Sequence, residues 1–368
     1  MTQSNPIRSG ERLPSLDGIR AISIAMVVLG HAKHTFPTWM HPDANWWDIV
    51  GTGSRGVSIF FVVSGFIITT LLLREHHTEG TISLRAFYVR RCFRILPPFY
   101  LFLACLAVSW ELGWIELGWR SLLASATFVR DYVNPNDWWT GHSWSLSVEE
   151  QFYLLWPAGL VLFGSRRMKE IAMQLIVVAP ALRLLTLFFL PHSTEPIGLM
   201  FHMRIDGLMC GCVLALMRAE PDFAQRCRRL LVWPLAALAA ILLFVVSTSL
   251  FWHYREIYWL VIGSSLENAC ISYLLLYTVE IPQSLAGRVL NLPVVAHVGQ
   301  ISYSLYLWQQ VFLTVLNTSV LGHFPLNLIA AFGAAELSWW LVEKPSLALR
   351  HRVQARVMKP RLLAAAAE

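Results

Sequence analysis

The sequence predicts an all-α membrane protein, a polytopic helical bundle of about ten transmembrane helices with both termini in the cytoplasm. Hydrophobic residues make up 56% of the 368 residues and charged residues only 14%, which leaves too few polar side chains to coat a soluble globule. Apolar runs of roughly twenty residues, the length of a bilayer helix, recur about ten times. Lys and Arg gather in short clusters between these runs, as in membrane proteins.

The apolar runs lie near 14–34, 56–74, 87–110, 143–163, 171–190, 198–217, 230–250, 256–279, 295–320 and 325–342. An even number of spans puts both termini on one side. Basic clusters follow the fourth, sixth and tenth runs, whereas the loops 35–55 and 111–142 hold few cations. Short cytoplasmic loops carry the excess of Lys and Arg, so both termini are predicted to be cytoplasmic.

Composition also excludes several functions. The net charge of +6 could suggest nucleic acid, but the cations follow the topology rule instead of forming a binding face, so no nucleic-acid partner is expected. The six cysteines lack metal-ligand or disulfide spacing, so free thiols and no metal are expected. We expect one membrane domain, 1–346, and a basic cytoplasmic tail, 347–368, that forms a juxtamembrane helix. The polar segment before residue 13 has no cleavage signal after it, so the first run is expected to remain a span.

The first run contains two ionisable residues, Arg20 and His31. Eleven positions are about three helical turns, so the two side chains share one face about 16 Å apart. Each costs roughly 2.5–3.5 kcal/mol within a span on insertion scales and therefore normally faces a protein interior. A structural role in holding helices together explains either residue alone equally well.

In the second run Gly56, Ser58, Ser64 and Gly65 are expected to let neighbouring helices approach closely. The third run begins with FYVRRCFRILPPFY and places Arg91 and Arg94 on one helix face, with Arg90 beside them. Membrane anchoring explains these arginines about as well as function does. Guanidinium pairs also suit phosphate and pyrophosphate, so a soluble phosphorylated cosubstrate could dock there.

The fourth run begins with GHSWSLSVEEQFYLLWP and places His142, Glu149 and Glu150 near the outer end of a helix. Adjacent carboxylates point in different directions on a helix, so one is expected to face the interior and the other the headgroups or a capping site. A carboxylate beside an imidazole orients a general base, which makes one glutamate the expected partner of His31. Simple support of the helix N-terminus is the alternative.

Later runs contain further polar groups in apolar surroundings, namely Arg183, Arg204, Asp206, Glu267, Glu336, Tyr303, Tyr306, Trp308, Gln309 and Gln310. The ionisable groups need partners in the bundle, and Arg183 is one candidate partner. The aromatic and amide groups are typical of membrane belts and packing, yet they also stack on and hydrogen-bond to sugars. The tryptophans of the loop 111–142 suit an interfacial location, and residues 120–129 could form a short surface helix.

Seven motifs along the chain together resemble the acyltransferase type 3 family of multi-pass bacterial O-acyltransferases. They are LDGIRA with His31 after it, GVSIFFVVSGFIIT, FYVRRCFRILPPFY, SWSLSVEEQFYLLWP, FHMRIDGLMCG, ISYSLYLW and Val342-Glu343-Lys344-Pro345. The resemblance implies a ten-helix enzyme that takes an acyl group, usually acetyl, from cytoplasmic acyl-coenzyme A and delivers it to hydroxyls of cell-surface glycans. By resemblance Arg20 and His31 match the essential Arg and His of the family, and Arg91 and Arg94 its RxxR pair.

The chain departs from the family pattern at two points. Many members continue the ninth-run motif as Leu-Trp-His followed by Pro, whereas this chain has Gln309 and Gln310, which argues against an acid–base role at that position. Some members carry a second, soluble hydrolase-like domain. The chain stops near the last span, so a second step is expected to need another protein.

The resulting prediction is a membrane O-acyltransferase of the bacterial inner membrane that uses acetyl-coenzyme A or another acyl-coenzyme A. Arg90, Arg91 and Arg94 would bind the donor, and His31 would act as general base or as an acyl carrier, oriented by Glu149 or Glu150. Arg20 would stabilise the oxyanion or sit on the entry path of the donor. The expected substrate-binding residues are His142, Arg204, Asp206, Tyr306 and Trp308.

The acceptor stays open among O-antigen of lipopolysaccharide, capsule, peptidoglycan, exported oligosaccharides and glycosylated antibiotics. Membrane lipids are the other expected partners, and the sequence gives no oligomeric state. A glycan or lipid transporter without acyl transfer is the main alternative, and the absence of a visible repeat counts modestly against it. A non-catalytic sensor is disfavoured by the many ionisable residues in the spans.

Overall fold

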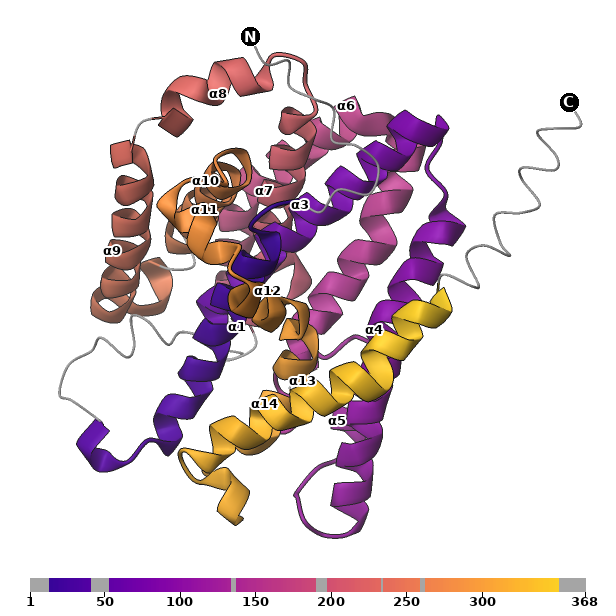
Figure 1. Cartoon of the computed structure of the whole chain (residues 1–368), viewed down its shortest axis with the longest axis vertical. Coiled ribbons are helices and arrows are strands. Elements are labelled where there is room, and N and C mark those ends of the chain that lie inside the picture. The colour runs from indigo at the N-terminus through magenta and orange to yellow at the C-terminus, as the bar shows by residue number, and fades with distance from the viewer. Residues whose placement is uncertain are drawn as a thin grey trace, which may run out of the picture.

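The computed structural model describes residues 13–40, 53–133, 137–189, 197–232, 234–258 and 262–350, and the regular structure in these residues is helical (Figure 1). The α-helices are α1 (Leu16–Ala32), α3 (Gly53–Glu79), α4 (Leu84–Glu111), α5 (Trp119–Ala126), α6 (Ser143–Phe189), α7 (Phe201–Arg218), α8 (Phe223–Val232), α9 (Pro234–Tyr258), α10 (Ser264–Glu280), α11 (Leu285–Leu290), α12 (Pro293–Gln300), α13 (Ser302–Phe312) and α14 (Leu326–Ser338). The short helical turns are η1 (Lys33–Thr35), η2 (Thr38–Met40), η3 (Ile197–Leu199), η5 (Val320–Gly322) and the π-turn η6 (Trp339–Glu343), after which a helix runs on to residue 350.

Small residues allow the central helices to pack closely. A Cβ added to Gly65 of α3 would lie 2.0 Å from the carbonyl oxygen of Leu208 in α7, and one added to Gly211 of α7 would lie 2.0 Å from that of Val62 in α3. Gly56 meets α1 in the same way, so the predicted close approach is confirmed at both glycines. The result is a core in which α3 lies between α1 and α7 (Figure 1).

The fourth and fifth apolar runs form a single long element, α6, that bends at Gly164. This glycine has a φ of 74°, in the left-handed region that other residues avoid. The bend divides α6 into two helical halves that correspond to the two predicted runs. α7 packs extensively against α6, which makes these helices the second layer around the core.

The ninth run is not the single helix that the sequence predicts for 295–320. It divides at Ile301 into α12 and α13, and α13 ends at Phe312. Gly299 permits the backbone of Asp17 in α1 to come within 1.8 Å of where a Cβ would be, so α12 lies tightly against α1. Beyond α13, the side chain of Asn317 accepts hydrogen bonds from the backbone and hydroxyl of Ser319, which favours a turn over further helix.

The described helices expose many apolar side chains, as expected for a protein surrounded by lipid. The helices α3 and α4 are each long and apolar enough to cross a membrane, and about two thirds of the apolar window of α4 is not buried within the protein. On α6 the exposed side chains include Leu154, Leu162, Phe163 and Val177. A soluble monomer rarely leaves so many large apolar groups in water. The number of spans and their orientation remain predictions.

The loop between α4 and α6 matches its prediction in part. α5 forms the expected short helix, and Trp114 and Trp119 are exposed, as interfacial residues would be. Trp139 is buried and Trp138 is half-buried, so these two are part of the protein interior instead. The residues before position 13 and most of the basic tail, from 351 onward, lie outside the described residues, although 347–350 are helical.

Several buried charges have the partners that the sequence required. Arg183, which the sequence offered as a candidate partner without indicating for which group, pairs with Asp206. The Arg55 Nε lies 2.9 Å from a carboxylate oxygen of Glu267. Glu336, which is only partly buried, has its Oε1 2.6 Å from Nε2 of His297. The six cysteines are free thiols, as predicted.

Candidate active site

A cavity of about 410 Å³ lies between α1, α3, α4, α6, α13 and η6, the turn that follows α14. We call it the arginine cavity because three arginines line it. Its charged lining also includes several carboxylates, and the main charged residues are Arg20, Arg91, Arg94, Glu149, Glu150 and Glu343. Its volume is typical of a small-molecule site. Tyr306 lines the cavity as well. Six of the residues predicted for the site therefore meet here: Arg20, Arg91, Arg94, Glu149, Glu150 and Tyr306.

Two of the three arginines of α4 face the cavity and the third does not. Arg91 and Arg94 are three residues apart and so share a face. The Arg91 guanidinium lies 4.9 Å from the ring centre of Tyr153, a cation–π contact that fixes its direction. Arg90 instead forms an ion pair with Glu75 at 2.6 Å and ties α4 to the end of α3. The prediction of donor contact therefore rests on Arg91 and Arg94, whereas Arg90 has a structural partner.

Glu149 and Glu150 both line the arginine cavity, so the expectation that one of them turns away from the interior is wrong. Glu149 accepts a hydrogen bond from the Ser64 hydroxyl of α3, and the same hydroxyl lies 3.2 Å from the phenol oxygen of Tyr153. The cavity extends between α3, α4 and α6, and both carboxylates are part of its lining. Ser64 was expected to serve close packing, and its observed role is to hold a carboxylate.

His31 lies outside the arginine cavity and is paired with an amide, not with a glutamate. Its Nδ1 is 2.7 Å from Oε1 of Gln309 in α13, and its ring packs edge-on against Trp138 with centroids 5.3 Å apart. The predicted contact with Glu149 or Glu150 is thus wrong, because α13 supplies the partner of His31 instead. We call His31, Gln309 and Trp138 the histidine site.

The tautomer of His31 follows from its partner. Gln309 places its amide nitrogen toward the carbonyl oxygen of Tyr306, at 3.5 Å, so Oε1 is the atom that faces the imidazole. A carbonyl oxygen only accepts, so Nδ1 carries the proton in the neutral ring and Nε2 bears the lone pair. Nε2 makes no hydrogen bond to any residue in the described ranges, and it lies near Gly53 at the start of α3.

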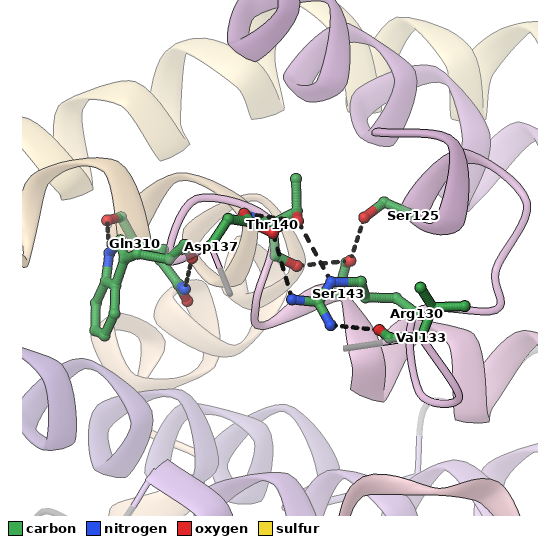
Figure 2. Close-up of polar contacts among 8 residues, drawn as sticks. Ser125, Arg130, Val133, Asp137, Thr140, Ser143 and Gln310 are labelled. Carbon is green, nitrogen blue, oxygen red and sulfur yellow. Dashed lines mark hydrogen bonds and ion pairs between the residues drawn. The ribbon is translucent and has the colours of Figure 1, made fainter. Parts of the chain in front are cut away.

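Figure 2 shows a polar network in the loop before α6. Trp138, whose ring packs against His31, belongs to this loop. Arg130 is the centre of the network: it donates to the carbonyl of Val133 at 2.7 Å and pairs with Asp137 at 3.4 Å. Asp137 in turn accepts from the backbone of Thr140 at 2.8 Å. These bonds hold the chain before and after Trp138 in place. The indole N–H of Trp138 itself donates to the carbonyl oxygen of Gln310 at 2.9 Å.

Three predicted substrate-binding residues gather between the cavity and the histidine site. Tyr306 donates to the carbonyl oxygen of His142 at 2.9 Å and contacts the Ser145 hydroxyl at 2.6 Å. The imidazole of His142 is buried, and neither of its nitrogens has a partner among the described residues. Trp308 packs on Phe102, and its indole N–H is likewise without a described partner. Unpartnered buried donors and acceptors are costly, so they mark this cluster as a place for further polar contacts.

Arg204 and Asp206 of α7 do not line the cavity and are engaged elsewhere. Arg204 donates to the carbonyl of Gly198 at 2.6 Å and to the Ser54 hydroxyl at 2.8 Å, and it lies over the ring of Trp144. Asp206 pairs with Arg183 and accepts from Ser265 at 3.2 Å. These contacts join α3, α6, α7 and α10, so the two residues have structural partners in this structure.

Sequence reasoning did not assign a site role to Ser64, Tyr153, Glu343, Gln309 or Trp138. Tyr153 lies four residues after Glu149 in α6, so helical spacing could have placed it on the same face. No such signal exists for Gln309 and Trp138, because both lie far from His31 along the chain, Gln309 by 278 positions.

Apolar outer faces and a cavity lined by arginines and carboxylates are features typical of an integral membrane protein with a polar internal site. The particular family is given by comparison: the family model for an acyltransferase domain matches residues 13–343. The chain belongs to this family, the acyltransferase 3 family of integral membrane acyltransferases, as its motifs predicted.

Curated relatives agree with this assignment. The chain is 27% identical to the peptidoglycan O-acetyltransferase OatA of Listeria monocytogenes over 92% of its own length and 56% of the relative. It is 27% identical to O-acetyltransferase OatA of Staphylococcus aureus, over 90% and 57%, and 26% identical to the putative peptidoglycan O-acetyltransferase YrhL of Bacillus subtilis, over 90% and 54%. The chain thus spans little more than half the length of these relatives. No solved structure matches it.

Proposed function

We propose that the protein is a membrane O-acetyltransferase that moves the acetyl group of acetyl-coenzyme A to a hydroxyl of a carbohydrate-containing acceptor. The observation that carries the proposal is His31, whose Nδ1 faces the amide oxygen of Gln309 while Nε2 stays free of described partners. This is the tautomer that a general base needs. The family supports acyl transfer over transport, and the relatives named as O-acetyltransferases support acetyl.

The arginine cavity is the proposed donor site. Arg91 and Arg94 present two guanidinium groups from one helix face, which suits the phosphates of coenzyme A. Arg20 lines the same cavity, whereas His31 lies three turns farther along α1 and outside it. This placement supports a role for Arg20 on the entry path of the donor, not at the reacting carbonyl.

The acetyl group must then reach the histidine site. Tyr306 and Ser145 line the cavity and lie between it and His142, and their hydroxyls bond to each other. We propose that the thioester-bearing arm of the donor passes this pair of hydroxyl groups on its way to the histidine site. The acceptor would bind beyond it, where Trp138 offers an aromatic face and His142 and Trp308 offer polar atoms without described partners.

The chemical step balances without a further reactant. Nε2 of His31 takes the proton of the acceptor hydroxyl as the oxygen attacks the thioester carbonyl, and the C–S bond breaks as the ester forms. The proton on the imidazolium goes to the leaving thiolate, which regenerates the neutral base. A two-step route in which Nε2 itself carries the acetyl group uses the same nitrogen.

For the acceptor we propose a glycan of the cell envelope, reached from the outer face of the cytoplasmic membrane. Two of the relatives are named as peptidoglycan O-acetyltransferases, one of them putatively, so peptidoglycan or its precursor is favoured over lipopolysaccharide. The basic loops at 164–170 and 218–229 support a donor side in the cytoplasm. Labelling of a cysteine introduced at Arg167 by an impermeant reagent added outside whole cells would overturn this orientation.

The direct test uses the purified full chain in liposomes with [acetyl-14C]acetyl-coenzyme A and peptidoglycan fragments as acceptors. We expect release of free coenzyme A and labelled ester on the glycan, both dependent on His31. Movement of glycan across the bilayer with acetyl-coenzyme A left intact would instead support a transporter. Mass spectrometry of the envelope glycans of a deletion strain would identify the natural acceptor.

A further inference from the structure

Glu343 is a buried carboxylate in the arginine cavity that the proposed reaction does not use. It is the last residue of η6, and its side chain is completely buried. The Ser304 hydroxyl of α13 donates to its Oε2 at 2.9 Å, whereas Oε1 has no hydrogen-bond partner among the described residues. One oxygen is therefore held in place by Ser304, and the other is buried in the wall of the cavity without a described partner.

The surroundings of Glu343 show which part of a ligand it could meet. Arg94 and Arg20, which line the same cavity, are the cations whose positive charges attract this carboxylate. A phosphate next to the free oxygen would be repelled by the carboxylate, so phosphates belong on the guanidinium groups. A carboxylate oxygen only accepts hydrogen bonds, so the group beside Oε1 must bring an N–H or O–H.

The local backbone supports a fixed role for this carboxylate. Turns of π-helix are rare in proteins, but those that occur are often found at functional sites, where they change the direction of side chains at one point of a helix. Here the turn Trp339–Glu343 separates α14 from the helical stretch that follows. A buried carboxylate oxygen without a hydrogen-bond partner costs more free energy than an unpartnered neutral group. A ligand that donates a hydrogen bond to this oxygen removes that cost.

We propose that Glu343 is a donor-binding residue that accepts a hydrogen bond from an amide N–H of the pantetheine arm of the acyl donor. Ser304 positions it, and Arg94 and Arg20 compensate its charge. The inference rests on the proposed function, since it takes coenzyme A as the donor. It adds a contact that recognises the uncharged arm, separate from the arginines that recognise phosphate.

The test measures binding of three probes to the purified full chain: acetyl-coenzyme A, S-acetylpantetheine and adenosine 3′,5′-bisphosphate. Glu343→Gln removes the charge and Glu343→Ala also removes the acceptor. We expect Glu343→Ala to weaken binding of acetyl-coenzyme A and S-acetylpantetheine by about tenfold or more, the size of a hydrogen bond to a charged group. Binding of the bisphosphate should stay equal or tighten, because a negative charge near the arginines is gone.

Ser304→Ala is the matched variant, because it keeps the carboxylate but releases it, and it should weaken the same two probes by a smaller factor. Glu336→Gln, on α14 outside the cavity, is the control and should change no affinity. Thermal unfolding shows whether the alanine variant is folded. If it is not, the probe affinities of Glu343→Gln are used instead. Unchanged S-acetylpantetheine affinity, or a loss confined to the bisphosphate, overturns the inference while the proposed function stands. If the wild type binds no acetyl-coenzyme A, both fail.

Discussion

The arginine cavity is lined by charged side chains, whereas the partners of His31 in the histidine site are neutral. The cavity gathers Arg20, Arg91 and Arg94 with several carboxylates, so its charges largely compensate one another. The histidine site contains no charged partner of His31 among the described residues, only the amide of Gln309 and the ring of Trp138. The arginines of the cavity offer guanidinium groups to an anionic donor. A neutral imidazole with a proton on Nδ1 has a lone pair on Nε2 that can accept a proton. The comparison therefore assigns donor binding to one region and proton transfer to the other.

The largest effect should come from removing the base. His31→Ala should lower acetyl transfer by about 10²-fold or more, the lower end of what loss of a general base costs. Binding of acetyl-coenzyme A should persist, because His31 lies outside the arginine cavity. Initial rates of transfer in liposomes and equilibrium binding measure the two effects, with His34→Ala as the control. Near-normal transfer by a folded His31→Ala variant would move the search for a base to His142.

Removing either cavity arginine should have the reverse pattern. Arg91→Ala or Arg94→Ala should raise KM for acetyl-coenzyme A by about tenfold or more, since each removes charge-assisted hydrogen bonds to phosphate. Lysine at either position should restore only part of the affinity, because it lacks the planar fork. Arg85→Ala, at an exposed position of α4, is the matched control. Equal donor affinity in all these variants would reduce the arginines to structural residues.

A change at Gln309 tests how the histidine site is held. Gln309→Leu should lower kcat by about tenfold with little change in KM for the donor, because His31 loses the acceptor that fixes its tautomer. Gln309→Glu keeps an acceptor and should retain more activity. Its carboxylate also favours the imidazolium, so the acid limb of the pH–rate profile should move to higher pH. A profile identical to that of the wild type in Gln309→Glu would argue against contact with the base.

The smallest effect concerns the loop that supports Trp138. Burial raises the pKa of Asp131 to about 6, against hydrogen bonds from Gln151 and from the backbone of Phe201 that act in the opposite direction. The unfolded carboxyl titrates near pH 4. Between about pH 4 and 6 the folded state therefore holds more of the proton, and the stability from this group falls as the pH rises through that window.

Thermal unfolding of the detergent-solubilised protein from pH 4 to 7.5 should detect this slope. Asp131→Asn does not titrate, so its Tm should lose that part of the pH dependence. Glu116→Gln, an exposed position of the same loop, should keep the slope of the wild type. Parallel curves for Asp131→Asn and the wild type would show that the group is not buried in solution as it is here.

Some features of this protein follow from its sequence alone. Several apolar runs coincide with helices, such as 56–74 with α3 and 87–110 with α4, since the hydrophobic length of a helix is a local property. The spacing of Arg91 and Arg94 placed both on one face, and small residues such as Gly56 and Gly65 marked close helix contacts. Family motifs identified an acyltransferase. Each of these signals lies within one segment of the chain, where helical geometry relates sequence to space directly.

Only the tertiary structure decided which side chains meet. His31 was expected beside a glutamate, but α13 brings Gln309 to it, and Glu149 and Glu150 both turn into the arginine cavity. Glu343 joins that cavity from the other end of the chain. Arg204 and Asp206 resemble ligand residues in sequence, yet packing gives them partners inside the protein. Burial leaves each polar group in need of a partner, but the choice of that partner depends on how separate helices pack, which no local pattern encodes.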